Sequence, residues 1–120
     1  MPNVIMAVDD SSSMRKMVRA VLQAAGYEVV EASDGVEAIE YAHDHAVDLV
    51  ITDVNMPRMD GIALVSQLRQ LPGYRLTPIL LLTTESSQEK KMEGKRAGAT
   101  GWIVKPFDPE HLLATISKVL

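Results

Sequence analysis

The chain has 120 residues, of which 47% are hydrophobic and 23% charged, and it carries a formal net charge of −4. This length suits one domain that buries roughly two-thirds of its unfolded surface, and this composition excludes an intrinsically disordered protein. The negative charge disfavours direct nucleic-acid binding, and the sequence shows neither an apolar run of membrane-spanning length nor a secretory signal, so we expect a cytoplasmic protein.

Five short apolar runs have the length and the β-branched content that are typical of strands. In chain order, the predicted strands are Val4–Val8, Tyr27–Val30, Leu49–Thr52, Ile79–Leu82 and Trp102–Val104. Three of these runs are apolar without alternation, which indicates a parallel sheet that is covered on both faces.

The stretches after the strands carry apolar residues three and four positions apart, which predicts amphipathic helices. The clearest apolar stripes run over Met14–Leu22, Leu64–Leu71 and Leu112–Leu120. We predict that Ser11–Ser13 caps the first helix, that Gly26 and Gly73 end helices, and that Pro109 lies in the first turn of a helix.

Five β-α units with right-handed crossovers predict an α/β protein with one doubly wound, five-stranded parallel sheet and five helices. Residues 1–120 are expected to form a single domain, because the sequence shows no internal repeat and no linker. We also expect no output domain in this chain.

Polar residues follow four of the predicted strands, at the edge of the sheet where ligands bind in folds of this type. Asp9 and Asp10 follow the first strand, Asp53 the third, Thr83 the fourth and Lys105 the fifth. Neighbouring strands lie about 4.8 Å apart, so Asp53 would lie close to the Asp9–Asp10 pair if the first and third strands are neighbours.

Three carboxylates so close together would repel one another by roughly 4 kcal/mol per close pair, which a bound cation would relieve. Oxygen ligands without His or Cys favour Mg²⁺, which is typically held by carboxylates together with a phosphate. Lys105 and the hydroxyl of Thr83 would complete a site for phosphoryl transfer, with Asp53 as the candidate nucleophile.

Each of these residues also has a simpler interpretation. Asp10 alone suits a helix cap, Lys105 alone suits a solvated lysine, and Thr83 suits an ordinary strand end. Their joint placement favours the phosphoryl-transfer site, whereas Asp60 before Gly61 indicates a turn or helix start and is left out of it. The histidines lack metal-ligand spacing and are expected at the surface; they are His43, His45 and His111.

Four segments together resemble the bacterial response-regulator receiver family over the whole chain. They are Val8-Asp9-Asp10-Ser11, Thr52-Asp53-Val54-Asn55-Met56-Pro57 with Met59-Asp60-Gly61, Leu82-Thr83-Thr84, and Val104-Lys105-Pro106-Phe107. The resemblance implies a flavodoxin-like sheet with strand order 2-1-3-4-5 and a cis peptide bond between Lys105 and Pro106.

The resemblance also implies the chemistry of the site. A partner histidine kinase would phosphorylate Asp53, while Asp10, Asp53 and the backbone carbonyl of Asn55 would bind Mg²⁺, with Asp9 acting through a water molecule. Mn²⁺ would be able to replace Mg²⁺. No other cofactor is expected, and the protein would not be an enzyme beyond slow self-phosphorylation and autodephosphorylation.

The same resemblance implies that further residues take part in the conformational switch. Thr83 and Lys105 would contact the phosphoryl group, and the aromatic residue that follows the movement of Thr83 would be Trp102, where the family more often has Tyr or Phe. Asn55 and Glu85 would tune dephosphorylation.

The closest resemblance within the family is to single-domain chemotaxis regulators of the CheY type. The implied partners are a histidine kinase, a target such as a flagellar motor component, and a phosphatase, for a monomer without direct nucleic-acid or membrane contact. The target would bind the face of the fourth helix, the fifth strand and the fifth helix. The basic residues of Ser87–Arg96 suit an acidic partner segment, although a merely solvated helix explains them as well.

Other functions remain open at this point. A phosphorelay intermediate, a regulator of a kinase or adaptor, and an unphosphorylated binding module would share the fold. A flavin-binding module is disfavoured because Asp9 and Asp10 would repel a phosphate at the first helix. A turnover phosphatase is disfavoured because we find no second acid-base carboxylate beside Asp53.

Overall fold

A computed structural model describes residues 2–120 of the chain. The elements in chain order are β1 (Val4–Val8), α1 (Ser12–Ala24), β2 (Glu28–Ala32), α2 (Gly35–Asp44), β3 (Leu49–Thr52), α3 (Gly61–Leu68), the 3₁₀ turn η1 (Pro72–Tyr74), β4 (Ile79–Thr83), α4 (Gln88–Ala97), β5 (Gly101–Val104) and α5 (Pro109–Val119).

The strands form one parallel sheet in the order β2-β1-β3-β4-β5, which confirms the predicted fold class. Val8 at the end of β1 pairs with Thr52 at the end of β3, and Thr83 at the end of β4 pairs with Val104 of β5. The residues that follow these strands therefore meet at one edge of the sheet.

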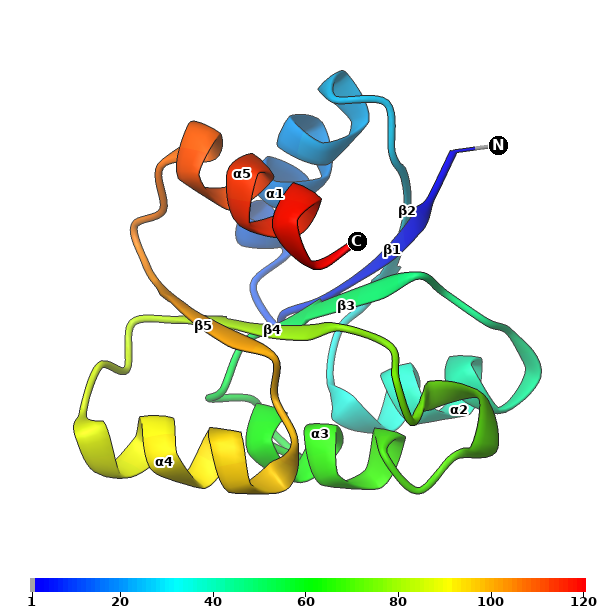
Figure 1. Cartoon of the computed structure of the whole chain (residues 1–120), viewed down its shortest axis with the longest axis vertical. Helices are drawn as coiled ribbons and strands as arrows, with labels where there is room; N and C mark the ends of the chain where they lie inside the picture. Colours follow the sequence, from blue (N-terminus) through cyan, green and yellow to red (C-terminus); the bar gives the residue numbers. More distant parts are fainter. Residues whose placement is uncertain (1) are drawn as a thin grey trace.

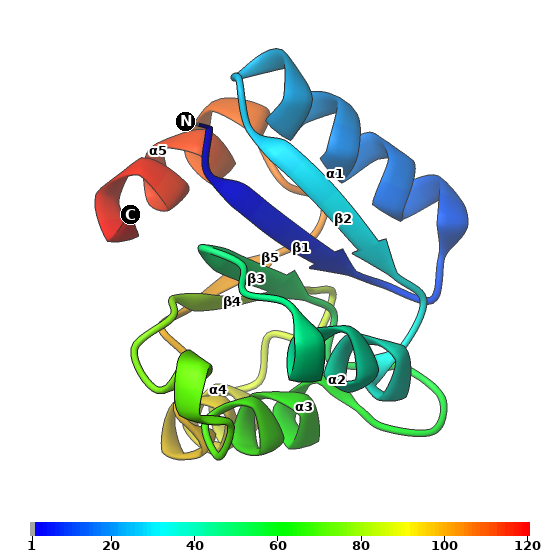
Figure 2. The ribbon, with the colours of Figure 1, turned by 90° about the vertical axis from the view of Figure 1, so that its right-hand side faces the viewer.

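Helices cover both faces of the sheet (Figures 1 and 2), with α1 and α5 on one face and α2, α3 and α4 on the other. The core is accordingly split into two apolar clusters, one on each face. Residues of β1, β3 and β4 contribute to both clusters, which explains why their sequences are apolar without alternation.

The second strand differs from its predicted bounds, because it begins at Glu28 and continues to Ala32. The prediction stopped before Glu31, whose charge is unusual within a strand. In the structure Arg15 and Arg19 of α1 both bind the Glu31 carboxylate, at 3.2 Å and 2.7 Å. Both contacts lower the pKa of Glu31, and the contact with Arg19 has the larger effect. The two arginines thereby compensate the charge of Glu31 at the edge of the sheet.

The helix ends also refine the prediction. Ser11 caps α1 by accepting a hydrogen bond from the Met14 amide, and Gly26 follows α1 with a φ of 94°. Pro109 begins α5, as expected. Gly73 does not end a helix but lies within η1, whereas Gly98, with a φ of 110°, caps α4.

The helix α3 ends at Leu68, before the predicted limit at Leu71. The guanidinium of Arg69, the next residue, donates hydrogen bonds to the carbonyl oxygens of Gly98, Tyr74 and Thr77. These contacts stabilise the turn that leads into β4, and Pro72 cannot continue a regular helix. None of the helices in residues 2–120 is both long and apolar enough to cross a membrane.

Candidate functional site

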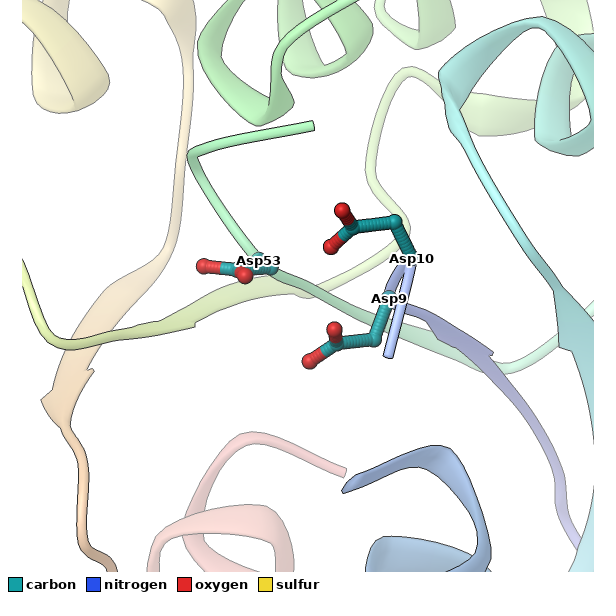
Figure 3. Close-up of side chains that lie close together, drawn as sticks. All are labelled: Asp9, Asp10 and Asp53. Atoms are coloured by element: carbon teal, nitrogen blue, oxygen red, sulfur yellow. The ribbon is translucent and has the colours of Figure 1, made fainter. Parts of the chain in front are cut away.

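Three carboxylates come together at the carboxyl edge of the sheet. Figure 3 shows Asp9 and Asp10 leaving the end of β1 with Asp53 beside them, and one oxygen from each lies within 4.8 Å of the others. The sheet ladder sets this geometry, because the Asp53 amide donates to the Val8 carbonyl oxygen at 3.0 Å and the Asp9 amide to that of Ala32 at 3.1 Å. The predicted cluster is therefore present.

Backbone amides orient two of the three carboxylates. Asp9 Oδ1 accepts a hydrogen bond from the Ser11 amide at 2.9 Å, and Asp53 Oδ1 accepts one from the Val54 amide at 2.7 Å. Asp10 is exposed, and no cation of residues 2–120 forms an ion pair with it. Asp10 does not cap α1, because Ser11 has that role.

Lys105 reaches the cluster from the end of β5. Its Nζ lies 2.9 Å from Asp9 Oδ2 and 3.3 Å from Asp53 Oδ2, and the three side chains are 10%, 9% and 12% exposed, respectively. Burial alone would lower the pKa of Lys105, but the hydrogen bond to Asp9 and the charges of Asp53 and Asp9 outweigh it and raise the pKa. Lys105 therefore carries its charge within the site, and the peptide bond to Pro106 is cis, as the resemblance implies.

The charges of this cluster fit a divalent cation. Three carboxylates and one ammonium group leave two negative charges without a partner, and Asp10 supplies a carboxylate that is open to solvent. All available ligand atoms are oxygens, which suits Mg²⁺ and disfavours zinc. The space beneath Asp9 and Asp53 has a volume of only about 10 Å³, so a ligand must approach from the solvent side.

Thr83 and Trp102 both form hydrogen bonds with the backbone of Glu85. The hydroxyl oxygen of Thr83 accepts a hydrogen bond from the Glu85 amide at 3.2 Å, and Trp102 Nε1 donates to the Glu85 carbonyl oxygen at 2.9 Å. Thr83 is fully buried, whereas Trp102 is half-buried against α4. Thr83 is the last residue of β4, and within residues 2–120 its side chain forms no hydrogen bond to the three carboxylates, so its role in the site stays a prediction.

The loop between β3 and α3 carries Asn55, which is exposed two residues after Asp53. Asp60 lies outside the cluster and caps α3, because its carboxylate accepts a hydrogen bond from the Ala63 amide at 2.8 Å. The helix-start interpretation of Asp60 is thus confirmed. His43, His45 and His111 are all exposed.

Sequence reasoning missed two arginines near the site. Arg15 of α1 donates a hydrogen bond to the backbone carbonyl oxygen of Asp9, and Arg58 of the β3–α3 loop binds Asp34. Arginines on a helix and in a turn give no sequence signal for such contacts, since their partners are set by the tertiary fold.

Comparison with known proteins assigns the chain to a family. Residues 5–117 match the response regulator receiver domain. The transcriptional regulatory protein SrrA of Staphylococcus aureus is 34% identical over 120 residues, which cover 100% of this chain and 48% of SrrA. The chain thus spans about half the length of the curated relatives it matches.

Solved structures agree in fold and in sequence. The chemotaxis protein CheY4 of Vibrio cholerae is 54% identical with a TM-score of 0.96, and the match covers 100% of both chains. The receiver domain of the sensor histidine kinase PA1611 from Pseudomonas aeruginosa is 25% identical with a TM-score of 0.91, over 98% of this chain and 97% of that one. That structure holds a magnesium ion in its active-site cleft.

Proposed function

Because the chain belongs to the response regulator receiver domain family of two-component signalling, we propose that it is a phospho-accepting switch and that a histidine kinase phosphorylates Asp53. The observation that carries this proposal is the cluster of Asp9, Asp10 and Asp53, in which Asp9 and Asp53 also bind the buried ammonium group of Lys105. Residues 1–120 would act as one receiver domain.

The proposed reaction moves a phosphoryl group between two nucleophiles. A carboxylate oxygen of Asp53 forms the new O–P bond as the P–N bond of a phosphohistidine breaks, and the bonding electron pair stays on the imidazole. Val54 holds one Asp53 oxygen through its amide, which fixes the direction of the carboxylate. Lys105 lies where its ammonium group would pair with a phosphoryl oxygen.

The metal site would use oxygens of three residues directly. Asp10, Asp53 and the backbone carbonyl of Asn55 would hold Mg²⁺, or Mn²⁺ in its place, and Asp9 would act through water. When bound, the ion neutralises charge on the phosphoryl oxygens. The two uncompensated negative charges of the site support a divalent ion, as does the magnesium in the related PA1611 receiver structure.

The switch would pass from the site to α4 through Glu85. A phosphoryl group on Asp53 offers new acceptors for the buried Thr83 hydroxyl, which now accepts from the Glu85 amide. Movement of Thr83 would disturb the Glu85 peptide, whose carbonyl oxygen is bonded to Trp102. We propose that this shared peptide couples the two side chains, and that the side chains of Asn55 and Glu85 tune the slow hydrolysis of the aspartyl phosphate.

The output surface would be the face formed by α4, β5 and α5. Met92 of α4 and Val104 of β5 are 48% and 41% exposed, and α4 also carries Lys91 and Lys95. This combination suits an acidic protein segment with apolar residues. The similarity to the chemotaxis protein CheY4 favours chemotaxis, with a motor component as target and a phosphatase as a further partner of a monomeric protein.

The test is phosphorylation by acetyl phosphate, followed by mass spectrometry of the intact protein. The wild type should gain one labile phosphoryl group only with Mg²⁺, and Asp53→Asn should gain none. Asp60→Asn is the matched control, since it makes the same change on the same loop outside the site. Lys105→Ala should accept the phosphoryl group but fail to activate a partner. A phosphorylated Asp53→Asn protein would refute the proposed acceptor.

A further inference from the structure

The β3–α3 loop contains a strained turn a short distance after Asp53. Arg58 has a φ of 66°, and it is the one residue other than glycine in the described part of the chain with a positive φ. The turn is closed by the Met59 amide, which donates to the Pro57 carbonyl oxygen at 2.7 Å. Three-residue turns with a positive central φ are rare and strained, and such strain persists only where surrounding contacts enforce it.

An ion pair with Asp34 ties this turn to the start of α2. The Arg58 guanidinium donates to both carboxylate oxygens of Asp34, from Nε at 2.8 Å and from Nη2 at 3.1 Å. Arg58 is 58% exposed, whereas Asp34 is 10% exposed. Asp34 also caps α2 by accepting a hydrogen bond from the Glu37 amide at 2.9 Å, so its carboxylate is fixed independently of Arg58. Arg58 and the Glu37 amide lower the pKa of Asp34.

Two glycines allow close contacts between the β3–α3 loop and neighbouring segments. A Cβ added to Gly35, the first residue of α2, would lie 2.9 Å from the Cβ of Met59. A Cβ added to Gly61 would lie 2.0 Å from the carbonyl oxygen of Asp53. The loop thus lies against α2 at Met59, which follows Arg58 directly, and against the Asp53 backbone at Gly61.

We propose that Arg58 and Asp34 form a positioning pair that fixes the β3–α3 loop and thereby sets the affinity of the site for Mg²⁺. This inference rests on the proposed function, in which Asn55 supplies a backbone carbonyl to the ion. The pair touches neither the metal site nor the phosphoryl site. It acts by holding the backbone on which Asn55 lies, since a ligand held in advance does not need to be ordered when the ion binds.

Calorimetric titration of the whole chain with Mg²⁺ tests the proposal. Arg58→Asn removes the guanidinium and retains a residue that tolerates a positive φ, and Asp34→Asn retains an oxygen to cap α2. We expect the Kd for Mg²⁺ to rise about tenfold in each, the low end of the effect of partners that orient metal ligands. The Kd of the double variant should rise no further than that of either single variant, because the two substitutions break the same contact.

The sign of the two effects separates positioning from simple electrostatics. If only net charge mattered, loss of the Arg58 cation would strengthen Mg²⁺ binding and loss of the Asp34 anion would weaken it. Positioning predicts weaker binding in both cases. Arg19→Asn is the matched control, because it removes another partly exposed arginine from its carboxylate, leaves the Arg15–Glu31 pair in place, and should leave the Kd unchanged.

Several outcomes decide the question. A Kd within twofold of the wild type in Arg58→Asn, or opposite shifts in the two variants, would overturn the proposal. At saturating Mg²⁺, phosphorylation of both variants by acetyl phosphate should return to the wild-type rate. If the wild type itself binds no Mg²⁺, the proposed function fails rather than the positioning. Should Asp34→Asn unfold, Arg58→Asn decides alone, since Arg58 lies outside every helix and strand.

Discussion

Replacement of Lys105 by methionine tests how the site balances its charges. Lys105 Nζ lies 2.9 Å from Asp9 and 3.3 Å from Asp53, and all three side chains are at most 12% exposed. Methionine fills a similar space without charge, so Lys105→Met isolates the electrostatic contribution. The variant leaves two largely buried carboxylates facing each other without a protein cation.

The expected loss of stability follows from these distances. Two unit charges about 4 Å apart repel by roughly 4 kcal/mol at an effective dielectric constant of 20, and removal of one partner from a buried pair costs about 3–5 kcal/mol. The site is open to water beside the exposed Asp10, which favours the low end of this range. We therefore expect a loss of about 3 kcal/mol without Mg²⁺, which a domain with a stability of about 5–15 kcal/mol survives folded.

Urea unfolding followed by circular dichroism measures this loss with and without millimolar Mg²⁺. The ion should stabilise Lys105→Met more than the wild type, because it replaces the missing positive charge, so the difference between the two proteins should shrink. Lys90→Met is the control, since the Lys90–Glu93 pair is 44% and 40% exposed and its loss should not be measurable. An equal loss with and without Mg²⁺ would refute the charge-balance argument.

Two further predictions concern packing and pH. Gly94→Ala should lower the free energy of unfolding in urea by about 1–3 kcal/mol, although alanine has the better helix propensity. The reason is that the added Cβ would lie 2.8 Å from a Leu81 methyl group. Gly73→Ala is the control and should lose no stability, because an added Cβ there would have no atom within 4 Å. Because the folded state raises the pKa of Lys105, its stabilisation is complete below the unfolded lysine pKa of about 10.4 and is lost as the pH rises through the folded value. The stability difference between wild type and Lys105→Met should therefore narrow in strongly alkaline buffer, and a constant difference would contradict this linkage.

The sheet could be predicted because its central strands leave a strong signal. β3 and β4 are buried along their whole length, so every residue in them must be apolar or small. The edge strand β2 gave a weaker signal, because Glu31 lies within it and is compensated by two arginines from α1. Such compensation depends on which helix lies beside the strand, which a local pattern does not contain.

The carboxylates and Lys105 could be placed together for a topological reason. In a parallel sheet all strands end at the same edge, so Asp9, Asp53 and Lys105 must meet there once the strand order is known. The Asp34–Arg58 contact could not be placed in this way. Both residues lie in loops whose paths are set by side-chain packing, and each by itself suits an ordinary turn or helix cap.

The packing of Trp102 shows how two sequence features explain each other once the structure is known. Trp102 is larger than the usual Tyr or Phe, and Gly94 of α4 lies opposite it. A Cβ on Gly94 would lie only 3.1 Å from Trp102 Cζ3, so the missing side chain makes room for the indole. If Trp102 turned outwards, it would leave a void beside Gly94 and break its bond to Glu85. The void would lie beside α4, and the broken hydrogen bond would lie in the loop before it. The position of the indole and the position of α4 should therefore change together.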